Sequence, residues 1–308
     1  MARLVYFGTP GLAVAPLEAL VAAGHDVGLV VTRPDRRRGR GAAVAPSPVK
    51  EAAGRLGLPV VHRLDEVLAH AAGPFDLGVV VAYGRLIPEA LLDAVPMVNL
   101  HFSLLPRWRG AAPVERAILA GDAVTGVCLM GVEAGLDTGP VFARVEVEIG
   151  QHEHLDDLRA RLVAAGSELL VTGLAAGLGD GEPQVGTPTY AEKLAPDELA
   201  LVWERPAADL ERVVRLDRAF TTWRGRRLRV LDARAVADGA PDRVSPEDGP
   251  PGSLIDDDVV TGSGRLRLLR VQAAGSVPMD AAAWRRGAHV GPGDRFDGGA
   301  PAAEGKES

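Results

Sequence analysis

Short apolar runs alternate with stretches of helical periodicity from residue 1 to about residue 179, and this alternation restricts the fold more than any other feature of the sequence. Strands are expected over residues 4–7, 27–31, 77–82, 97–100, 126–130 and 141–145, and helices over 13–23, 48–56, 64–71 and 112–120. Short apolar strands joined by helices are typical of a parallel sheet that helices cover on both faces. The sequence therefore predicts an α/β fold with a doubly wound, mostly parallel sheet.

A long helix and a linker are expected after this region. Leu155, Leu158, Leu162 and Leu169 mark one face of the helix. The stretch 179–189 is rich in Gly and Pro and has neither helical nor strand periodicity, which is typical of a linker. The predicted limits are 1–182 for the first domain, 183–205 for the linker, 206–298 for a second domain and 299–308 for a disordered tail.

The second domain is predicted to be a small β-barrel. It begins with a helical pattern near Leu210. Short strand candidates follow, separated by Gly, Pro and Asp turns, at 227–231, 253–255, 259–261 and 266–271. Strands this short at this spacing favour an antiparallel, OB-like barrel.

Composition excludes several classes of protein. Among the 308 residues no apolar run approaches the length that spans a bilayer, and no basic-then-apolar leader is present, so we expect a cytoplasmic protein without a membrane partner. Cys128 is the single cysteine, which rules out an internal disulfide and a thiolate zinc site, and no metal is expected. A net charge of −7 argues against indiscriminate binding to nucleic acid.

Two clusters of arginine could still contact phosphate locally. The first spans residues 33–40 and the second spans residues 224–229. A solvated, solubilising surface is the alternative interpretation of each cluster. Charge alone leaves both interpretations open.

Three polar side chains suggest a site for acyl transfer. Asn99 and His101 lie where an apolar strand is expected to end, and Asp137 follows His101 by 36 residues in a loop bracketed by glycines. An amide and an imidazole can donate hydrogen bonds to a developing oxyanion, and a carboxylate can take or relay a proton from an attacking amine. Each residue also has a structural interpretation, as a packed histidine, a strand-end cap or a turn aspartate.

The segments around these residues resemble a known family. Residues 99–113 read Asn-Leu-His-Phe-Ser-Leu-Leu-Pro-Arg-Trp-Arg-Gly-Ala-Ala-Pro, and residues 135–139 read Gly-Leu-Asp-Thr-Gly. Together they resemble the signature of formyltransferases that use 10-formyltetrahydrofolate, and the ending of the first segment is most similar to the methionyl-tRNA formyltransferase family. Further matches are Phe-Gly-Thr-Pro at 7–10, the Arg- and Gly-rich run at 34–41 that leads to 46–50, and Thr-Tyr-Ala-Glu-Lys-Leu at 189–194.

The resemblance implies a Rossmann-like formyltransferase domain and a barrel that helps to hold a tRNA. Asn99, His101 and Asp137 match the family's catalytic residues. The implied reaction moves the formyl group from N10 of the folate to the α-amine of methionine on initiator tRNA. In that reaction Asn99 and His101 stabilise the oxyanion, and Asp137 sets the charge of the histidine and handles the amine proton.

The resemblance also implies two binding segments. The folate is expected against backbone and side chains of two stretches, Val80, Ala82, Tyr83 and Gly84, and Ser103, Leu104, Leu105 and Pro106. Arg40 matches the arginine of a Gly-Arg-Gly element that contacts the tRNA in the family, with Arg38 and Gly39 beside it. The chain lacks an obvious apolar helix face for dimer formation, which favours a monomer.

Other interpretations remain open at this point. The formyl acceptor could be a nucleotide sugar or a glycinamide ribotide. Gly8-Thr-Pro-Gly11 could belong to a nicotinamide-dependent oxidoreductase, although it lacks the G-x-G-x-x-G spacing. A catalytically silent RNA-binding protein is a third possibility. His152-Glu-His154 has no third ligand nearby and is interpreted as the polar start of a helix rather than a metal site.

Overall fold

The computed structural model describes residues 2–38, 43–70, 74–236, 249–291 and 293–297. The chain divides into two compact units. The first comprises Met1–Arg116, Ala123–Ile149 and Leu158–Lys193, and the second comprises Ala117–Asp122, Gly150–Asp157 and Leu194–Ser308. Within the described ranges, none of the helices has both the length and the apolar character that crossing a bilayer requires.

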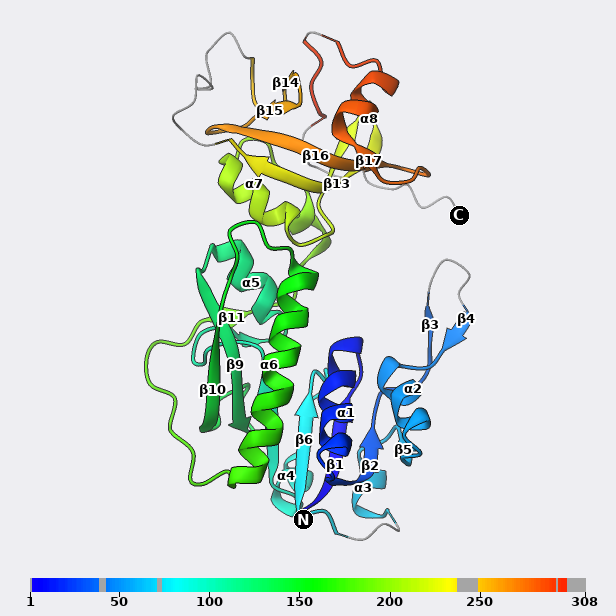
Figure 1. Cartoon of the computed structure of the whole chain (residues 1–308), viewed down its shortest axis with the longest axis vertical. Coiled ribbons are helices and arrows are strands. Elements are labelled where there is room, and N and C mark those ends of the chain that lie inside the picture. The colour runs from blue at the N-terminus through cyan, green and yellow to red at the C-terminus, as the bar shows by residue number, and fades with distance from the viewer. Residues whose placement is uncertain (1, 39–42, 71–73, 237–248, 292, 298–308) are drawn as a thin grey trace. The chain divides into compact units, whose positions relative to one another are not determined.

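The first unit is built on a seven-stranded sheet. In spatial order its strands are β10 (Val141–Glu148), β9 (Val124–Gly131), β7 (Met97–His101), β6 (Leu77–Val81), β1 (Arg3–Gly8), β2 (Asp26–Val31) and β5 (Val60–Val61). The five strands from β7 to β5 are parallel, whereas β9 is antiparallel to β7 and β10 to β9. Figure 1 shows β6, β1 and β2 side by side and running in the same direction. The predicted α/β class and mostly parallel sheet are confirmed.

The chain reverses its direction across the sheet between β1 and β6. It passes first from β1 to β2 and β5, and then returns to the other side of β1 with β6 and β7. This doubly wound order leaves a crevice outside the carboxyl ends of β1 and β6, where ligands of such sheets bind. The fold therefore directs attention to the residues that follow these two strands.

Helices connect most of these strands, and each of the following α-helices was predicted except the one at residues 89–94. They are η1 (Gly11–Ala13), α1 (Val14–Ala22), α2 (Pro48–Arg55), α3 (Asp65–Leu68), α4 (Glu89–Ala94), α5 (Pro113–Ala120) and α6 (Leu155–Ala176). Helix α2 begins at its Pro48 because the Ser47 side chain caps it, accepting a hydrogen bond from the backbone N–H of Lys50 at 3.0 Å. The leucine face of α6 differs in one position from the prediction, since Leu170 is buried and Leu169 is half-buried.

Two short strand pairs in the first unit were not predicted. Strands β3 (Arg36–Arg38) and β4 (Ala43–Ala45) are antiparallel, and they flank the predicted tRNA-binding residues Gly39 and Arg40, which lie outside the described residues. Strands β8 (Arg109–Gly110) and β11 (Tyr190–Ala191) are parallel. The second pair joins the segment at 99–113 to the segment at 189–194, both of which resemble formyltransferase motifs.

A hydrophobic cluster fixes the strands around the crevice. Val5 and Phe7 of β1, Leu29 of β2, Val80 of β6 and Tyr83 pack together, and the Phe7 and Tyr83 rings meet edge to face at 5.7 Å. Truncating a buried phenylalanine such as Phe7 to alanine costs about 3 to 5 kcal/mol. The positions of the strand ends at the crevice are therefore strongly determined by packing.

The second unit contains an antiparallel sheet. Its strands are β12 (Phe220–Trp223), β13 (Arg226–Ala235), β16 (Arg265–Ala273), β15 (Asp258–Val260) and β14 (Leu254–Ile255) in spatial order, with β17 (Met279–Asp280) also on β16. The helical elements are η2 (Pro196–Leu199), α7 (Ala207–Val214) and α8 (Ala281–Gly287). The predicted small antiparallel β domain is confirmed. Residues 294–297 connect the two edges of this sheet, because the Leu254 N–H donates to the Asp294 carbonyl at 3.1 Å and the Asp297 N–H donates to the Thr222 carbonyl at 3.1 Å.

Aromatic side chains fill the core of the second unit. Phe296 stacks on Trp203 at 5.2 Å and on Trp284 at 5.9 Å between ring centroids, and Trp223 meets both Phe296 and Trp284 edge to face. Stacked and edge-to-face aromatic pairs contribute about 0.5 to 1.5 kcal/mol each beyond the area they bury. Phe296 near the end of the described chain therefore anchors this segment to the sheet.

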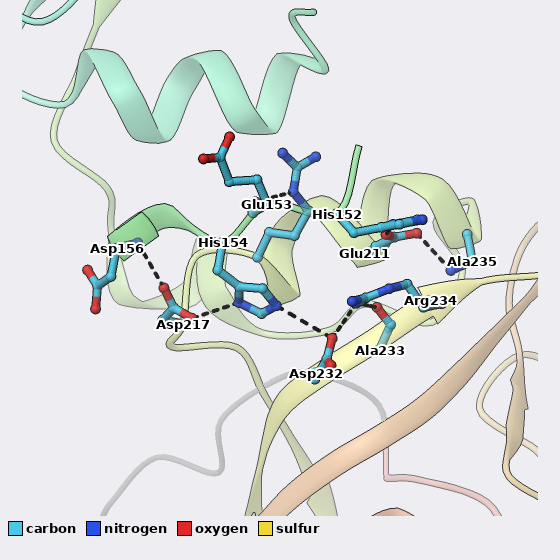
Figure 2. Close-up of polar contacts among 11 residues, drawn as sticks. His152, Glu153, His154, Asp156, Glu211, Asp217, Asp232, Ala233, Arg234 and Ala235 are labelled. Carbon is cyan, nitrogen blue, oxygen red and sulfur yellow. Dashed lines mark hydrogen bonds and ion pairs between the residues drawn. The ribbon is translucent and has the colours of Figure 1, made fainter. Parts of the chain in front are cut away.

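The two histidines before α6 contact carboxylates of the second unit. Nδ1 of His152 lies 2.5 Å from a carboxylate oxygen of Glu211, and Nδ1 of His154 lies 2.7 Å from Asp217. Figure 2 shows the His154 ring between Asp217 and Asp232, and Arg234 on the far side of Asp232. Asp217 also accepts a hydrogen bond from the backbone N–H of Asp156 at 3.3 Å, in the first turn of α6. These contacts account for the two histidines, which begin the helix as predicted.

Candidate functional site

A cavity of about 810 Å³ lies at the crevice of the first unit. Pro10 after β1, Val80 to Gly84 at the end of β6 and Asn99 to Phe102 at the end of β7 contribute to its wall. Residues 132–137, after β9, and side chains of α5 and α6 complete the wall. The cavity therefore occupies the position that the strand order predicts for a ligand.

His101 is held in one orientation by a backbone carbonyl. Its Nε2 atom lies 2.9 Å from the carbonyl oxygen of Trp108, and its side chain is 5% exposed. A carbonyl oxygen only accepts hydrogen bonds, so Nε2 carries a proton and donates it to Trp108. Trp108 has a φ of 63°, which is unusual for a bulky residue and directs its carbonyl at the ring. Nδ1 is therefore the ring nitrogen of His101 that is available to take part in a reaction.

Asp137 faces that nitrogen. Its Oδ2 atom lies 3.6 Å from Nδ1 of His101 and accepts a hydrogen bond of 2.7 Å from the backbone N–H of Gly110. Asp137 itself has a φ of 50°, a left-handed conformation that aspartate tolerates better than most residues. The carboxylate is thus anchored by one hydrogen bond while it stands beside the imidazole.

Gly110 has to be glycine for this contact to form. Its φ is 123°, and a Cβ atom there would lie 2.8 Å from the carbonyl oxygen of Ala191. The same carbonyl accepts hydrogen bonds from the backbone N–H groups of Ala111 and Ala112, at 2.8 and 3.1 Å. Close approach of β11 to β8 therefore sets the position of the Gly110 N–H that holds Asp137.

Asn99 is the third polar side chain beside His101 and Asp137, and it lies on an interior strand of the sheet. It lies on β7 between Val80 of β6 and Met130 of β9, and it lines the same cavity as His101 and Asp137. The structure thus brings the three side chains predicted from sequence to one cavity wall. An amide, an imidazole and a carboxylate arranged in this way can hold a carbonyl oxygen and move one proton.

The first group of predicted folate-binding residues lines the cavity. Val80, Ala82, Tyr83 and Gly84 all contribute to its wall. Burial raises the pKa of the Tyr83 phenol, although the guanidinium groups of Arg85 and Arg33 act in the opposite direction. The buried Tyr83 Oη makes no hydrogen bond of good geometry among the described residues, although the Arg85 guanidinium is near enough to lower the pKa of the phenol. A buried hydroxyl without such a hydrogen bond is costly, so this atom is suited to a polar group of a ligand.

The second predicted group is not on the cavity wall. Ser103, Leu104, Leu105 and Pro106 instead build the loop after β7. The Ser103 hydroxyl is buried and donates to the carbonyl oxygen of Arg107 at 2.6 Å, and Leu105 packs on Cys128 in the core. Other residues of the same motif line the cavity, namely Phe102, Gly110, Ala111, Pro113 and Val114, and folate binding by Ser103 to Pro106 stays a prediction.

The predicted tRNA-binding residues are only partly described. Arg38 ends β3, whereas Gly39 and Arg40 lie outside the described residues. One charged pair on the cavity wall was not predicted from the sequence: Arg159 of α6 lies 2.6 Å from Glu115 of α5. Gln184, which contacts the Asp137 loop, was not predicted either. A lone glutamine in a Gly- and Pro-rich segment carries no pattern that would have indicated this role.

Comparisons with known proteins identify the family. The family model described as "Formyl transferase" matches residues 2–174, and that described as "Formyl transferase, C-terminal domain" matches residues 193–289. A methionyl-tRNA formyltransferase of Roseobacter denitrificans is 45% identical over 96% of this chain and 99% of its own length. One from Clavibacter michiganensis subsp. michiganensis is 44% identical over 92% of this chain and 97% of its own length.

Solved structures share the fold at low identity. An N-formyltransferase of Helicobacter canadensis has a TM-score of 0.65 at 13% identity, covering 87% of this chain and 99% of its own. HypX of Aquifex aeolicus, in complex with tetrahydrofolic acid, has a TM-score of 0.61 at 16% identity over 92% of this chain, which spans about half (47%) of the HypX chain. The two matching domains and the close relatives over nearly the whole length place the chain in the formyltransferase family, and within it among the methionyl-tRNA formyltransferases.

Proposed function

We propose that the chain transfers the formyl group of 10-formyltetrahydrofolate to the α-amino group of methionine on initiator methionyl-tRNA. The product is N-formylmethionyl-tRNA for the initiation of translation. The observation that carries this proposal is the approach of Nδ1 of His101 to Oδ2 of Asp137, at 3.6 Å, on the wall of a ligand-sized cavity. The named relatives are the reason for choosing methionyl-tRNA as the acceptor.

The cavity fits the folate co-substrate. Its volume of about 810 Å³ lies within the range of pockets that enclose small organic ligands. Val80, Ile87, Leu92 and Met130 supply an apolar wall, and the Tyr83 Oη supplies a polar atom. We therefore assign folate binding to the segment from Val80 to Gly84. The folate brings the formyl carbonyl that is transferred.

His101 and Asn99 hold the formyl oxygen. Because the Nε2 proton of His101 is committed to the Trp108 carbonyl, Nδ1 can donate only when the ring is an imidazolium. The Asp137 carboxylate is the charged group that faces Nδ1, at 3.6 Å. A charged donor on Nδ1 and the amide of Asn99 then stabilise the negative charge that develops on the oxygen.

Asp137 also handles the proton of the acceptor amine. The amine must be neutral to attack, and it loses a proton after the new bond to carbon forms. Asp137 is a carboxylate at the cavity wall, and the Gly110 N–H occupies its Oδ2. The carboxylate can therefore accept the proton, directly or through a water molecule, while the Gly110 N–H keeps its position. The proton can then be delivered to N10 of the folate as the bond between N10 and the formyl carbon breaks, which releases tetrahydrofolate.

The tRNA side of the reaction involves residues away from the cavity. We assign tRNA contacts to Arg40, with Arg38 and Gly39, on the basis of the Gly-Arg-Gly element alone. The proposed domain limits stay at 1–182, 183–205 and 206–298, with the second domain helping to hold the tRNA. We further propose that the chain acts as a monomer in the cytoplasm.

One experiment tests the proposed function directly. The purified chain is incubated with 10-formyltetrahydrofolate and, in parallel, methionine-charged initiator tRNA, an amino-sugar nucleotide or glycinamide ribotide. We expect N-formylmethionine after mild hydrolysis of the tRNA, and no formylated product in the other two reactions. Formylation of the sugar nucleotide or the ribotide but not of the tRNA would contradict the acceptor assignment. A His101→Ala variant serves as the control for contaminating activity.

A further inference from the structure

We propose that Gln184 is a positioning residue for catalysis, because its side chain fixes the loop that carries Asp137. This inference rests on the role of Asp137 in the proposed function. Gln184 lies in the stretch between α6 and β11, 47 residues after Asp137 in the chain. Nothing in its sequence context marks it, yet its side chain makes four hydrogen bonds in the immediate neighbourhood of His101 and Asp137.

The amide nitrogen of Gln184 binds the Asp137 loop. Nε2 donates to the backbone carbonyl oxygen of Asp137 at 2.8 Å and to that of Gly139 at 2.9 Å. Two N–H groups thus bridge two carbonyls on either side of Thr138. The bridge supports the left-handed conformation of Asp137, whose φ is 50°. Such conformations cost about 1 to 3 kcal/mol for residues other than glycine and persist only where surrounding contacts enforce them.

The amide oxygen of Gln184 binds the opposite loop. Oε1 accepts two hydrogen bonds from the Arg109 guanidinium, from Nε at 3.1 Å and from Nη2 at 2.7 Å. Arg109 precedes Gly110, whose N–H holds the Asp137 carboxylate. The contacts therefore close a ring that runs from Gln184 to Asp137, on to Gly110 and Arg109, and back to Gln184. Both the backbone and the carboxylate of Asp137 are fixed by this ring.

Only a carboxamide of this length satisfies both sides. Arg109 can only donate hydrogen bonds, and the carbonyls of Asp137 and Gly139 can only accept them. The bridging side chain must therefore accept at one end and donate at the other. A glutamate at 184 would keep the contact with Arg109 but would place a carboxylate oxygen against two carbonyl oxygens. The residue type is thus determined by its partners.

The segment around Gln184 is itself anchored on both sides. Glu182 and Val141 exchange two backbone hydrogen bonds of 2.8 Å. Further along, the Thr189 carbonyl accepts from the Arg109 N–H at 2.9 Å, and the Thr189 hydroxyl accepts from the Trp108 N–H at 2.9 Å. Gln184 is therefore presented to the loop by backbone on either side of it, rather than by its own side-chain contacts alone.

The test compares Gln184→Glu and Gln184→Met with Val185→Ala. Val185 is the next residue, is 87% exposed, and serves as the matched control. We expect kcat for formylation to fall about 10- to 100-fold in both Gln184 variants, as for a small misplacement of a reacting group. The KM values for folate and tRNA should stay near those of the wild type. An unchanged kcat in Gln184→Glu, with the protein folded by circular dichroism, would overturn the proposal.

A double-mutant cycle separates positioning from general structural support. If Gln184 acts through the Asp137 carboxylate, Gln184→Glu should add little to the loss already caused by Asp137→Asn. The slow transfer rates expected of Asp137→Asn and of the double variant can be measured in single-turnover reactions with enzyme in excess over tRNA. Losses that multiply in the double variant would show that Gln184 acts independently of Asp137 and would overturn the proposal.

Failure of this inference is distinguishable from failure of the proposed function. A wild-type rate in Asp137→Asn alone would remove the role of Asp137 and the proposed function's mechanism with it. A slow Asp137→Asn together with wild-type Gln184 variants would remove only the positioning role. If both Gln184 variants fail to fold, Arg109→Lys probes the ring from the other side, since a single ammonium cannot reproduce the paired contact with Oε1. An unchanged kcat in Arg109→Lys would then count against the ring.

Discussion

Nδ1 of His101 lies 3.6 Å from Oδ2 of Asp137, and the other ring nitrogen, Nε2, donates a hydrogen bond to the carbonyl oxygen of Trp108. This arrangement assigns different tasks to the two nitrogens. Nε2 is a fixed donor that orients the ring, whereas Nδ1 faces the Asp137 carboxylate. The imidazole proposed to hold the formyl oxygen and the carboxylate proposed to take the amine proton therefore lie side by side.

Substitution of Gly110 should loosen this arrangement. In Gly110→Ala the new Cβ would lie 2.8 Å from the Ala191 carbonyl, at a φ of 123° that alanine disfavours, so β8 must move. We expect loss of stability and of formylation activity together, measured by thermal melting and by kcat. Gly54→Ala is the control, because Gly54 lies in α2 with open space around it. That change should stabilise the protein by about 0.5 to 1 kcal/mol. Equal changes of the melting temperature and of kcat in Gly110→Ala and Gly54→Ala would contradict this account of Gly110.

Cys128 should be unreactive in the folded protein. Burial raises the pKa of its thiol, and the side chain is fully buried in β9. Because the thiolate is the reactive form, a raised pKa lowers its fraction at neutral pH and moves its titration to more alkaline pH. A disulfide reagent at pH 7.5 should therefore detect no thiol in the native protein and one thiol per chain after denaturation. Rapid labelling of the native protein would show that the strand opens readily.

Glu211 should stabilise the second unit. One of its carboxylate oxygens pairs with His152 at 2.5 Å, and the other accepts from the backbone N–H of Ala235 at 2.8 Å. Removing both contacts in Glu211→Ala should lower the free energy of unfolding by about 2 to 3 kcal/mol. Glu211→Gln keeps an acceptor for Ala235 and should lose less. The control Glu18→Ala removes an exposed pair with Arg55 and should cost about 0.5 kcal/mol or less. Unfolding in denaturant measures these losses, and equal losses in Glu211→Ala and Glu18→Ala would argue against a stabilising role of the Glu211 contacts.

Arg40 should affect tRNA kinetics and leave folate kinetics unchanged. In Arg40→Ala we expect the KM for charged initiator tRNA to rise about threefold to tenfold, as for the loss of one phosphate contact. The salt dependence of log KM should become shallower by about one unit of slope. Arg63→Ala changes the net charge equally, at an exposed position paired with Asp65, and should leave the tRNA KM unchanged. A similar rise in both variants would indicate general electrostatics in place of a specific contact.

Sequence alone predicted the regular part of this fold. The strands at β1, β2, β6, β7, β9 and β10 have patterns that extend over several residues, and each is found at its predicted place. The pair β8 and β11 was not predicted because each strand has two residues, too few to show a period. Leu170 is buried and Leu169 is half-buried, although consecutive residues of a helix point about 100° apart, so the packing around the helix and not the leucine spacing decides which of the two is buried.

The candidate site was predictable in its residues but not in its geometry. His101 and Asn99 are at the end of a parallel strand, where a sheet of this class places its ligands. Asp137 is not at such an end. Its loop starts at Gly131, which pairs with Val98 nearer the start of β7, and it folds back to reach His101. Local pattern does not determine such a path, because tertiary hydrogen bonds from Gly110 and Gln184 hold it.

The rate of a single turnover in Asp137→Asn tests the central claim most directly. Asparagine keeps an oxygen to accept the Gly110 N–H, so the loop should retain its position while the negative charge beside Nδ1 of His101 is lost. With enzyme in excess over charged initiator tRNA and saturating 10-formyltetrahydrofolate, we predict that the transfer rate falls about 100-fold or more while folate binding is retained. A transfer rate equal to that of the wild type would contradict the account.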